Sequence, residues 1–502
     1  GEMRKSNFNF TIPQRQSYVA ILMIIWTTYR VLIRQVFPFL VIFFVGKSTK
    51  NNFGNYFLYF VIAVALIGML YSILAFFRYY FYIEEDKLIV EKGVFGRSKT
   101  IVPFERIQTI NFEQNLAHQV FSVLRLKVDT AGSAQKEFEF DAIAIYQAQA
   151  LRKIILEKKS KLAPIVEKSD NKVDATQENK VFKSILKLSI IDLIKVGITE
   201  NHFRSGALIL FALWWIWDSL REAGLDPEKY TEDIDPLAGG VIILVGLAVI
   251  FIILAFLFSL IRTVLKYFGL EFWRSNNGFK ISSGLFTKSD ISALDHKIQM
   301  ISWSDNLLRK IVGYYQLSLK QASSVVINNK TSINIPGCRQ DQIDMVTRAL
   351  YGANAFDDIE MESVDKIFMY RRMFFLSLLG IPFLLLGYFN SKPFVIIGGV
   401  ILVICFLITS YFRYKKCKFG HNEKMMIIRG GLFGDKAETL PIIKLQNIEI
   451  SQSPYQRRKK LANVKIHTAA GNVTIPYVGY NRAIQLSDYI LYKTESSNKR
   501  WM

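Results

Sequence analysis

Four long apolar runs without a charged residue interrupt an otherwise polar chain. They comprise residues 57–77, 237–261, 373–389 and 393–412. A helix needs roughly 20 apolar residues to cross the hydrocarbon core of a bilayer, and only the run 373–389 falls slightly short of that length. The pattern therefore predicts an integral membrane protein with at least four spanning helices.

Two shorter apolar runs, 36–45 and 205–217, each precede one of the long runs. If the short runs also span the membrane, the helices form three hairpins: 29–46 with 57–77, 205–220 with 237–262, and 373–389 with 393–412. The alternative is a protein with four spans, in which the short runs are buried core helices or re-entrant segments. The number of spans is even in both cases, so both predict the same sidedness.

The charges of the loops orient the hairpins. The loop from Asp218 to Asp235 carries seven acidic residues and only two bases. Basic residues instead flank the open ends of the hairpins: Arg30, Arg34, Arg78, Arg204, Arg262, Lys266, Arg371, Arg372, Arg413, Lys415 and Lys416. Because cytoplasmic loops are enriched in Lys and Arg, we expect the soluble parts and both termini to be cytoplasmic.

Each hairpin is followed by a soluble stretch that repeats one pattern. A turn glycine is followed thirteen positions later by a base and fifteen positions later by a glutamine. The glycines are Gly93, Gly284 and Gly431, the bases Arg106, Lys297 and Lys444, and the glutamines Gln108, Gln299 and Gln446. Glycine adopts turn conformations that other residues avoid, and a glutamine at a strand edge commonly satisfies backbone groups. We therefore expect structural roles for the glycines and glutamines.

Within each repeat the residues alternate as they do in β-strands. Residues 124–128 and 464–468 alternate apolar and polar side chains with period two, which is typical of half-buried strands. Each repeat ends in a helix-like segment, such as 142–156 or 340–350. We therefore predict an α+β membrane protein in which every transmembrane hairpin precedes a bent antiparallel sheet with a C-terminal helix.

This repeat resembles the bacterial pleckstrin-homology-like (PH-like) membrane proteins, in particular their three-domain YdbT-like type. The resemblance rests on the hairpin, the glycine turn, the basic-Ile/Leu-Gln motif and the following Leu-x-Val/Leu strand. The segment 12–17, Ile-Pro-Gln-Arg-Gln-Ser, resembles the entry segment of that family. The second repeat departs from the first at a position after the Leu-x-Val strand, where Ser323 takes the place of Gly132. Its hairpin loop is also long and acidic. The resemblance implies PH-like cytoplasmic domains in a bacterial inner membrane, a role in the cell envelope and a smaller one-domain partner. It implies no reaction.

The repeats divide the chain into nine parts. We expect an N-terminal cytoplasmic or interfacial segment (1–28), hairpin 1 (29–77), PH-like domain 1 (78–160), a linker with an interfacial helix (161–204), hairpin 2 (205–262), PH-like domain 2 (263–355), a linker (356–372), hairpin 3 (373–412) and PH-like domain 3 (413–495). Residues 181–198 can form either a helix lying in the membrane interface or a continuation of the last helix of domain 1.

The basic excess points to the membrane surface. The chain has 63 Lys and Arg against 42 Asp and Glu, with a formal net charge of +21. The densest cluster is Arg457, Arg458, Lys459 and Lys460, which either contacts anionic phospholipid headgroups or only fixes the topology. Arg106, Lys297 and Lys444 are weaker candidates for the same contact. No nucleic-acid recognition module accompanies the charge.

The sequence offers no catalytic motif and implies no cofactor or metal. The five histidines lie in different segments without metal-ligand spacing, and the three cysteines form no CxxC pair. We therefore expect a non-enzymatic scaffold that contacts phospholipid and forms oligomers or binds a smaller hairpin-plus-domain protein. The alternatives are a protein that senses or transports phospholipid and, third, an enzyme acting on lipid.

Overall fold

A computed structural model describes residues 10–31, 53–94, 96–130, 138–162, 183–200, 238–322, 332–389 and 393–496. The chain forms two compact units. The first contains residues 1–182 and 280–292, and the second contains residues 183–279 and 293–502. Each unit is considered by itself below.

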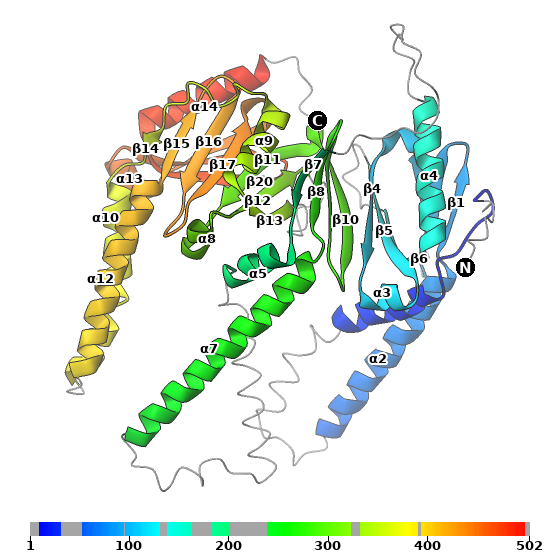
Figure 1. The fold of residues 1–502 in the computed structure, drawn as a ribbon, viewed down its shortest axis with the longest axis horizontal. Helices are drawn as coiled ribbons and strands as arrows, with labels where there is room; N and C mark the ends of the chain where they lie inside the picture. The colour runs from blue at the N-terminus through cyan, green and yellow to red at the C-terminus, as the bar shows by residue number, and fades with distance from the viewer. Residues whose placement is uncertain are drawn as a thin grey trace. The chain divides into compact units, whose positions relative to one another are not determined.

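The first domain, in the first unit, consists of two antiparallel sheets and one long helix (Figure 1). One sheet contains β1 (Tyr80–Glu84), β2 (Lys87–Lys92) and β3 (Ser98–Pro103), in that order. The 3₁₀ turn η1 (Phe104–Arg106) leads into the other sheet, which contains β4 (Ile107–Gln114), β5 (Val123–Thr130) and β6 (Phe138–Ala144), with α3 (Leu116–Val120) between β4 and β5. The helix α4 (Ile145–Leu162) follows.

Aromatic and aliphatic side chains from both sheets and α4 form the core of this domain. Phe81, Phe104 and Phe140 are fully buried together with Leu126 and Leu151. Burying such a side chain contributes about 1.5–3 kcal/mol, so the core fixes how α4 lies on the sheets. The prediction of a C-terminal helix that closes the sheet is therefore met in this domain.

The second domain follows the same order, with β7 (Lys183–Lys187), α5 (Ile190–Ile198) and α7 (Ala238–Tyr267) before its main strands. Those strands are β8 (Glu271–Ser275), β9 (Gly278–Ser283), β10 (Lys288–Leu294), β11 (Ile298–Ser304), β12 (Tyr315–Gln321) and β13 (Ser332–Cys338). The turn η3 (Asp295–Lys297) precedes β11, α8 (Leu307–Val312) precedes β12, and α9 (Gln340–Tyr351) closes the domain.

The third domain repeats this arrangement after β14 (Glu362–Ser363) and the helices α10 (Ile367–Leu378), α11 (Ile381–Phe389) and α12 (Pro393–Lys416). Its strands are β15 (Lys418–His421), β16 (Met425–Gly430), β17 (Lys436–Pro441), β18 (Leu445–Ser451), β19 (Leu461–Thr468) and β20 (Gly471–Gly479). The turn η4 (Ile442–Lys444), α13 (Pro454–Arg458) and α14 (Tyr480–Glu495) complete it.

The prediction of a single bent sheet in each domain is too simple. In the second unit, the strand order β13-β12-β11-β17-β16-β15-β14 forms one sheet, and β18-β19-β20 forms another. The first of these contains strands from both domains, because β11 pairs with β17. A domain therefore divides its strands between two sheets and shares one of them with the next domain.

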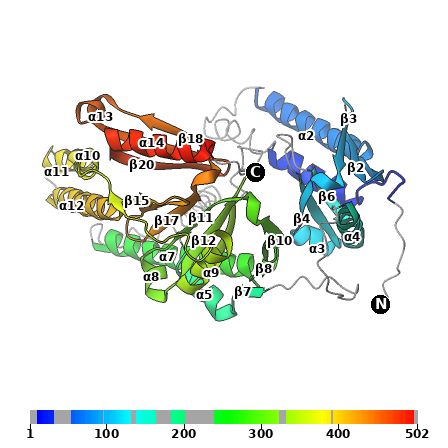
Figure 2. The ribbon, with the colours of Figure 1, turned by 90° about the horizontal axis from the view of Figure 1, so that it is seen from above.

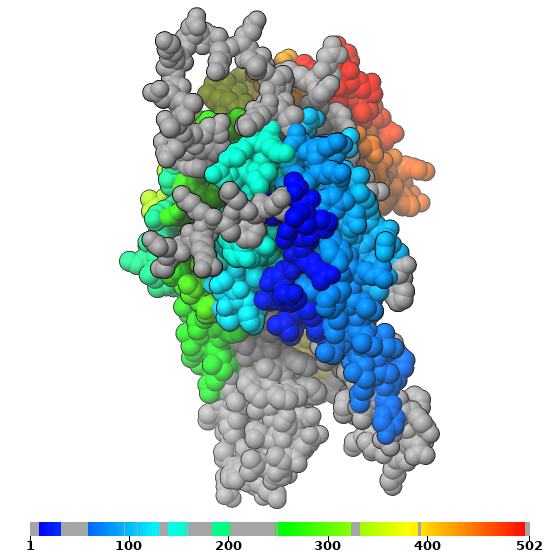
Figure 3. Space-filling view, turned by 90° about the vertical axis from the view of Figure 1, so that its right-hand side faces the viewer, coloured from blue at the N-terminus to red at the C-terminus, as the bar shows by residue number. Residues whose placement is uncertain are grey.

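The segment before each hairpin belongs to the domain that follows the hairpin. Gln14 exchanges backbone hydrogen bonds with Phe81, β7 pairs with β8, and β14 pairs with β15. Figure 3 shows the N-terminal segment, in dark blue, lying on the surface of the first domain. The expectation that 1–28, 161–204 and 356–372 lie outside the domains therefore needs correction. Residues 183–187 form a strand and only 190–198 a helix, because the backbone of β7 completes the hydrogen bonds of β8.

Among the described residues, four helices are long and apolar enough to cross a membrane: Tyr59–Phe77, Val249–Tyr267, Ile367–Phe389 and Pro393–Lys416. The third corresponds to α10 and α11, which lie beside α12 in Figures 1 and 2. A Cβ at Gly380 would lie 2.3 Å from Val403 Cγ2, so glycine allows these helices to pack closely. The predicted first arms 29–46 and 205–220 lie outside the described residues, apart from the end of a helix at Val19–Val31.

Candidate functional site

The repeated glycine has the same backbone conformation in all three domains. The φ angles of Gly93, Gly284 and Gly431 are +125°, +105° and +128°. A Cβ at Gly431 would lie 2.2 Å from the carbonyl oxygen of Gly434. The turn therefore requires glycine both for its dihedral angle and for its close backbone approach.

The repeated glutamines do not converge on one site. Gln299 is almost fully buried, and neither its amide oxygen nor its amide nitrogen has a hydrogen-bond partner in the described structure. Gln446 is exposed, and the side chain of Gln108 is outside the described part. The three positions share a place in the strand rather than a common environment.

The repeated bases also differ from one domain to another. Lys444 Nζ donates to the carbonyl oxygens of Ile298 (2.5 Å), His296 (3.0 Å) and Asp295 (3.4 Å), and burial lowers its pKa. Lys444 therefore joins the third domain to η3 of the second. Arg106 is exposed and Lys297 is half-buried, so the three bases share a sequence position but not a common environment.

The junction between domains is the most regular feature of the described chain. In β11 and β17, Trp303 lies opposite Ala437, and Ser304 lies opposite Lys436. In the first unit, β4 pairs with β10 of the second domain, where Phe112 lies opposite Asp290 and Glu113 opposite Ser289. At both junctions, the residue nineteen positions after one turn glycine lies opposite the residue six positions after the next turn glycine. The two junctions thus have an identical register.

Charged groups reinforce the junction in the second unit. Asp435 forms ion pairs with Lys416 (2.9 Å) and Lys310 (3.1 Å), and Lys320 pairs with Glu438 (3.3 Å). Burial raises the pKa of Asp435, but hydrogen bonds from Lys416 and Lys310 outweigh it, so the pKa lies below its ordinary value. A Cβ at Gly434 would lie 2.1 Å from the carbonyl oxygen of Asp305, so the two strands meet at van der Waals distance only with glycine there.

The shared sheet in the second unit also contributes to two cores. Met300 of β11 is fully buried in the core of the third domain, beside Leu440 of β17. Ile301, the next residue, is buried as well, and successive residues of a strand point to opposite faces. The junction is therefore not a mere edge contact, because both faces of β11 are covered.

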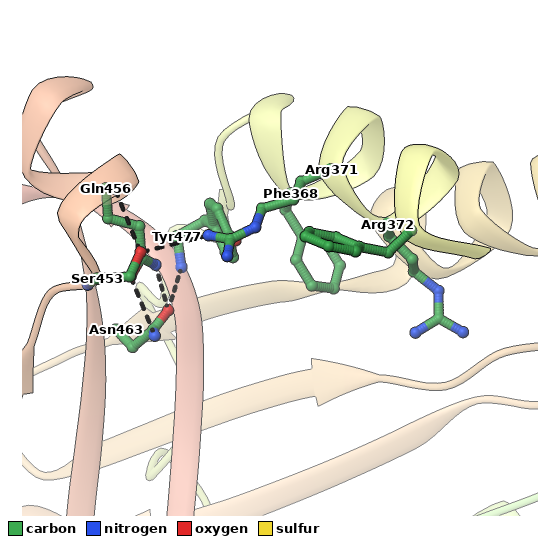
Figure 4. Close-up of a pocket in the computed structure, with 8 residues that line it drawn as sticks. Phe368, Arg371, Arg372, Ser453, Gln456, Asn463 and Tyr477 are labelled. Atoms are coloured by element: carbon green, nitrogen blue, oxygen red, sulfur yellow. Dashed lines mark hydrogen bonds between the residues drawn. The ribbon is translucent and has the colours of Figure 1, made fainter. Parts of the chain in front are cut away.

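A cavity of about 420 Å³ lies where α10 meets the third domain (Figure 4). It is lined by Phe368, Arg371, Arg372, Phe375, Ser453, Gln456, Asn463 and Tyr477. The side chain of Arg371 donates to Ser453 Oγ at 3.3 Å, and its guanidinium lies over the rings of Tyr455 and Phe375. Asn463 accepts hydrogen bonds from Gln456 Nε2 (2.8 Å) and from the backbone of Tyr477 (3.2 Å).

The positive charge of this cavity is not balanced by the described residues. The Nε atom of Arg372 is buried without a hydrogen-bond partner. The positive charge of Arg413 repels the same guanidinium. Within the described ranges, no acidic side chain forms an ion pair with Arg371, Arg372 or Arg413. Arg371 and Arg372 are half-buried and lack an acidic partner among the described residues, so the cavity suits an anionic group.

In the first domain, apolar side chains take the place of the two arginines of this cavity. The backbone of Tyr477 accepts from Asp365 N in the third domain, and the backbone of Ala142 accepts from Ser17 N in the first domain, so Tyr477 corresponds to Ala142. Beside Ala142 the space is filled by an apolar cluster of Ala20, Met23, Phe76 and Val123. Counted from the same backbone hydrogen bond, Arg371 and Arg372 take the places of Met23 and Ile24, so the third domain presents bases where the first presents apolar side chains.

Exposed apolar side chains gather near the membrane helices of the second domain. α5 buries Leu193 and Val196 but exposes Ile190, Ile191 and Ile194. Its Gly197 approaches Leu260 of α7, where a Cβ would lie 2.7 Å from Leu260 Cδ1. The helix is therefore not a continuation of α4, which ends at Leu162 before β7; it packs one apolar face on the protein and exposes another that suits the membrane interface.

The predicted basic cluster lies at the same loop as the cavity but outside it. Arg457 and Arg458 end α13, and together with Lys459 and Lys460 they are exposed. Ser453, which caps α13, and Gln456 line the cavity. Arg371 and Arg372 were not identified from the sequence as site residues. Bases that flank an apolar run are already expected from the positive-inside rule, so nothing in the sequence marked these two as binding residues.

The rest of the described chain adds no catalytic constellation. Asp295 accepts two hydrogen bonds from the guanidinium of Arg274, at 2.5 and 2.6 Å, which accounts for that carboxylate. The described residues contain no group of three His, Cys, Asp or Glu side chains that could hold a metal ion.

Comparison with known proteins explains the repeat. A family model described as a bacterial PH domain matches residues 18–159, 238–354 and 379–494, which is most of the chain. The chain belongs to the bacterial PH domain family. The three matches begin after the segments that pair with the first strands, Gln14, β7 and β14, so the family model does not include those segments. The resemblance inferred from the turn glycines and the glutamines is thereby confirmed.

Two relatives from Bacillus subtilis (strain 168) are similar to this chain. The UPF0699 transmembrane protein YdbT is 21% identical over 504 residues, covering 96% of this chain and 98% of its own length. The UPF0699 transmembrane protein YdbS is 29% identical over 111 residues, covering 21% of this chain and 70% of its own. A relative that matches nearly the whole chain and a smaller one that matches about a fifth of it therefore both exist.

Proposed function

We propose that this chain is a non-enzymatic membrane scaffold of the bacterial cell envelope. Its bacterial PH domains associate edge to edge and hold their hairpins in a defined row at the cytoplasmic face of the inner membrane. The observation that carries the proposal is the register shared by the β4–β10 and β11–β17 junctions. A register used twice is a reusable interface, and main-chain pairing at sheet edges is a general mode of protein assembly.

The same interface can accept domains from other chains. A smaller protein with one hairpin and one domain would have the strands that the junction needs, and the similarity to the smaller YdbS supports such a partner. The scaffold would then recruit it without a dedicated binding pocket. Contact with anionic phospholipid would come from Arg457, Arg458, Lys459 and Lys460, which are exposed beside α10.

Purification in mild detergent, with mass spectrometry of the co-eluting proteins, tests the scaffold. We expect a hairpin-plus-domain protein, or further copies of this chain, in a fixed ratio. The junction-weakening variant Gly434→Leu should leave the membrane helices in place but release the third domain from its neighbour, and Gly430→Leu, at an open position, is the matched control. A strictly monomeric chain without any protein partner would contradict the proposal.

A second function, the sensing of phospholipid, is favoured by the cavity of the third domain. Its bases, its aromatic side chains and its place at the end of a membrane helix fit a lipid phosphate with part of its acyl chains. A lipid bound there would contact both α10 and the α13 loop. Because α13 connects β18 to β19, binding of the lipid would affect the sheet β18-β19-β20. The scaffold remains the first proposal, because the same junction register occurs in two places.

A further inference from the structure

The strand β18 has an open edge. It is the outermost strand of the sheet β18-β19-β20, and its outer edge has no partner strand in the described part of the chain. Asn447, Glu449 and Ser451 are exposed along it. The corresponding strand of the second domain, β11, is buried from Ile298 to Ser302 because β17 pairs with it. The third domain thus ends in the same strand that joins the domains before it, but without a successor.

The strand β3 has the complementary open edge. It is the outermost strand of the sheet β1-β2-β3, and the described residues include no strand beside it. Its counterparts β10 and β17 both pair with the preceding domain. Ile101 of β3 is 50% exposed, whereas the equivalent residues of β10 and β17 are Ser292 and Thr439, both less exposed and polar. A half-exposed isoleucine on an open edge favours pairing with another strand.

We propose that β18 of one chain pairs with β3 of a second copy, in the register of the internal junctions. This inference rests on the scaffold function proposed above. The register places Ser451 opposite Ser98, Ile450 opposite Lys99 and Ile448 opposite Ile101. The last pair joins two isoleucines, and pairs of β-branched residues stabilise adjacent strands. A second copy is the occupant because every chain carries one edge of each kind.

The composition of β18 agrees with this pairing. The residues that point away from the core of its domain are Asn447, Glu449 and Ser451, and the equivalent residues of β4 are Thr109, Asn111 and Glu113. β4 has this polar face and is nevertheless paired with β10, with Asn111 accepting from Ser292 N at 3.1 Å. β18 also contains no proline or lysine, the residues with which open edges are commonly protected.

The resulting contact is heterologous, because two different edges meet. Such contacts generate rings when the rotation between copies closes, and open rows when it does not. Since every copy is held by its hairpins in the same membrane, the copies would follow one another in the membrane plane.

Cysteine cross-linking in membranes tests the pairing. One copy carries Ser451→Cys and a first tag, and the other carries Ser98→Cys and a second tag. Both lack the native cysteines (Cys338, Cys405 and Cys417 replaced by alanine). Directly opposite residues of antiparallel strands have Cα atoms about 4.5–5.5 Å apart, which suits a disulfide. We expect mild oxidation to give a dimer that carries both tags. The control pair, Gln446→Cys with Ser98→Cys, is displaced by five residues, about 17 Å along the strand, and should not cross-link.

Three results would overturn the inference: no dimer from the matched pair, an equally strong dimer from the control pair, or exclusively intramolecular cross-linking when both substitutions are on one chain. Ile101→Lys should lower the yield of the matched pair at least about tenfold without changing thermal unfolding. If the cross-link is absent but a one-domain protein still co-purifies, this inference fails and the scaffold stands. If both are absent, both fail.

Discussion

Asp305 and Asp435 join the second and third domains through a reciprocal pair of hydrogen bonds. The backbone of Asp305 donates to the carbonyl oxygen of Asp435 at 2.9 Å, and the backbone of Asp435 donates to the carboxylate of Asp305. The side chain of Asp435 is thereby left free to bind Lys416 and Lys310. One acidic residue therefore links a strand of the third domain, a loop helix of the second and the end of a membrane helix.

Acidification should weaken this junction. Because the pKa of Asp435 is lowered in the folded protein, its ion pairs contribute stability that is present above the unfolded pKa, about 3.9, and is lost as the pH falls through the lower folded value. The side chain is about half exposed, so we expect less than about 1 kcal/mol. Hydrogen exchange of the β17 amides, corrected for intrinsic rates, should show the loss between pH 5 and pH 3.

The variant Asp435→Asn should lower the protection of β17 already at neutral pH and remove most of its acid dependence. Asp488→Asn, at an exposed position on α14, serves as the control and should change neither. An unchanged acid dependence in Asp435→Asn would mean that other carboxylates hold the junction.

Replacement of a turn glycine should destabilise its domain. In Gly431→Ala, the new Cβ would lie 2.2 Å from the carbonyl oxygen of Gly434, and φ is +128°. We expect a loss of roughly 1–3 kcal/mol, the cost of a strained backbone position, measured as a lower unfolding temperature in detergent. The neighbouring Gly430→Ala has open space around its Cβ and should be tolerated. Equal effects of the two substitutions would contradict this role of the turn.

The cavity of the third domain should retain anionic lipid. Native mass spectrometry of the wild-type chain, reconstituted with phosphatidylglycerol, should detect bound lipid, and Arg371→Gln with Arg372→Gln should reduce its occupancy roughly tenfold, since hydrogen bonds to charged groups contribute about 1.5–3 kcal/mol. Arg457→Gln with Arg458→Gln removes the same charge from an exposed surface. If that control variant loses as much lipid as the cavity variant, the contact is a general electrostatic one.

The loop between the two arms of hairpin 2 should lie outside the cell. Asp226→Cys, in a chain without native cysteines, should react with a membrane-impermeant maleimide in intact cells, because the loop is acidic and cytoplasmic loops favour bases. A cysteine at the exposed Glu449 should react only after the cells are opened. Labelling of position 449 in intact cells would reverse the proposed topology.

The parts of the fold that depend on neighbours in the sequence could be predicted from it. The turn at Gly93, Gly284 and Gly431 needs glycine for local reasons, and the alternation of Val464 to Thr468 follows from the pleat of a single strand. The long apolar runs likewise correspond to α2 (Phe53–Phe77), α7 and α12, because length and composition are sufficient to identify a membrane helix.

The junctions could not be predicted in this way. Pairing of β11 with β17 uses backbone groups that every strand possesses, and its register depends on residues more than 130 positions apart in the chain. The cavity has the same difficulty, since Arg371 meets Ser453 and Tyr477 only after the third domain has folded. Likewise, nothing in the short segment Glu362–Ser363 marks it as the first strand of a sheet that resumes after a membrane hairpin.

That interrupted sheet has a consequence for how the protein is made. Val364 lies in the core of the third domain and Phe10 in that of the first, but in both cases a hairpin separates these residues from the rest of the core. The ribosome must therefore synthesise the whole intervening apolar segment before either domain can bring its first and later strands together. The core of each domain is completed only after that segment has left the ribosome, so folding of the domain and synthesis of its membrane helices are coupled in time.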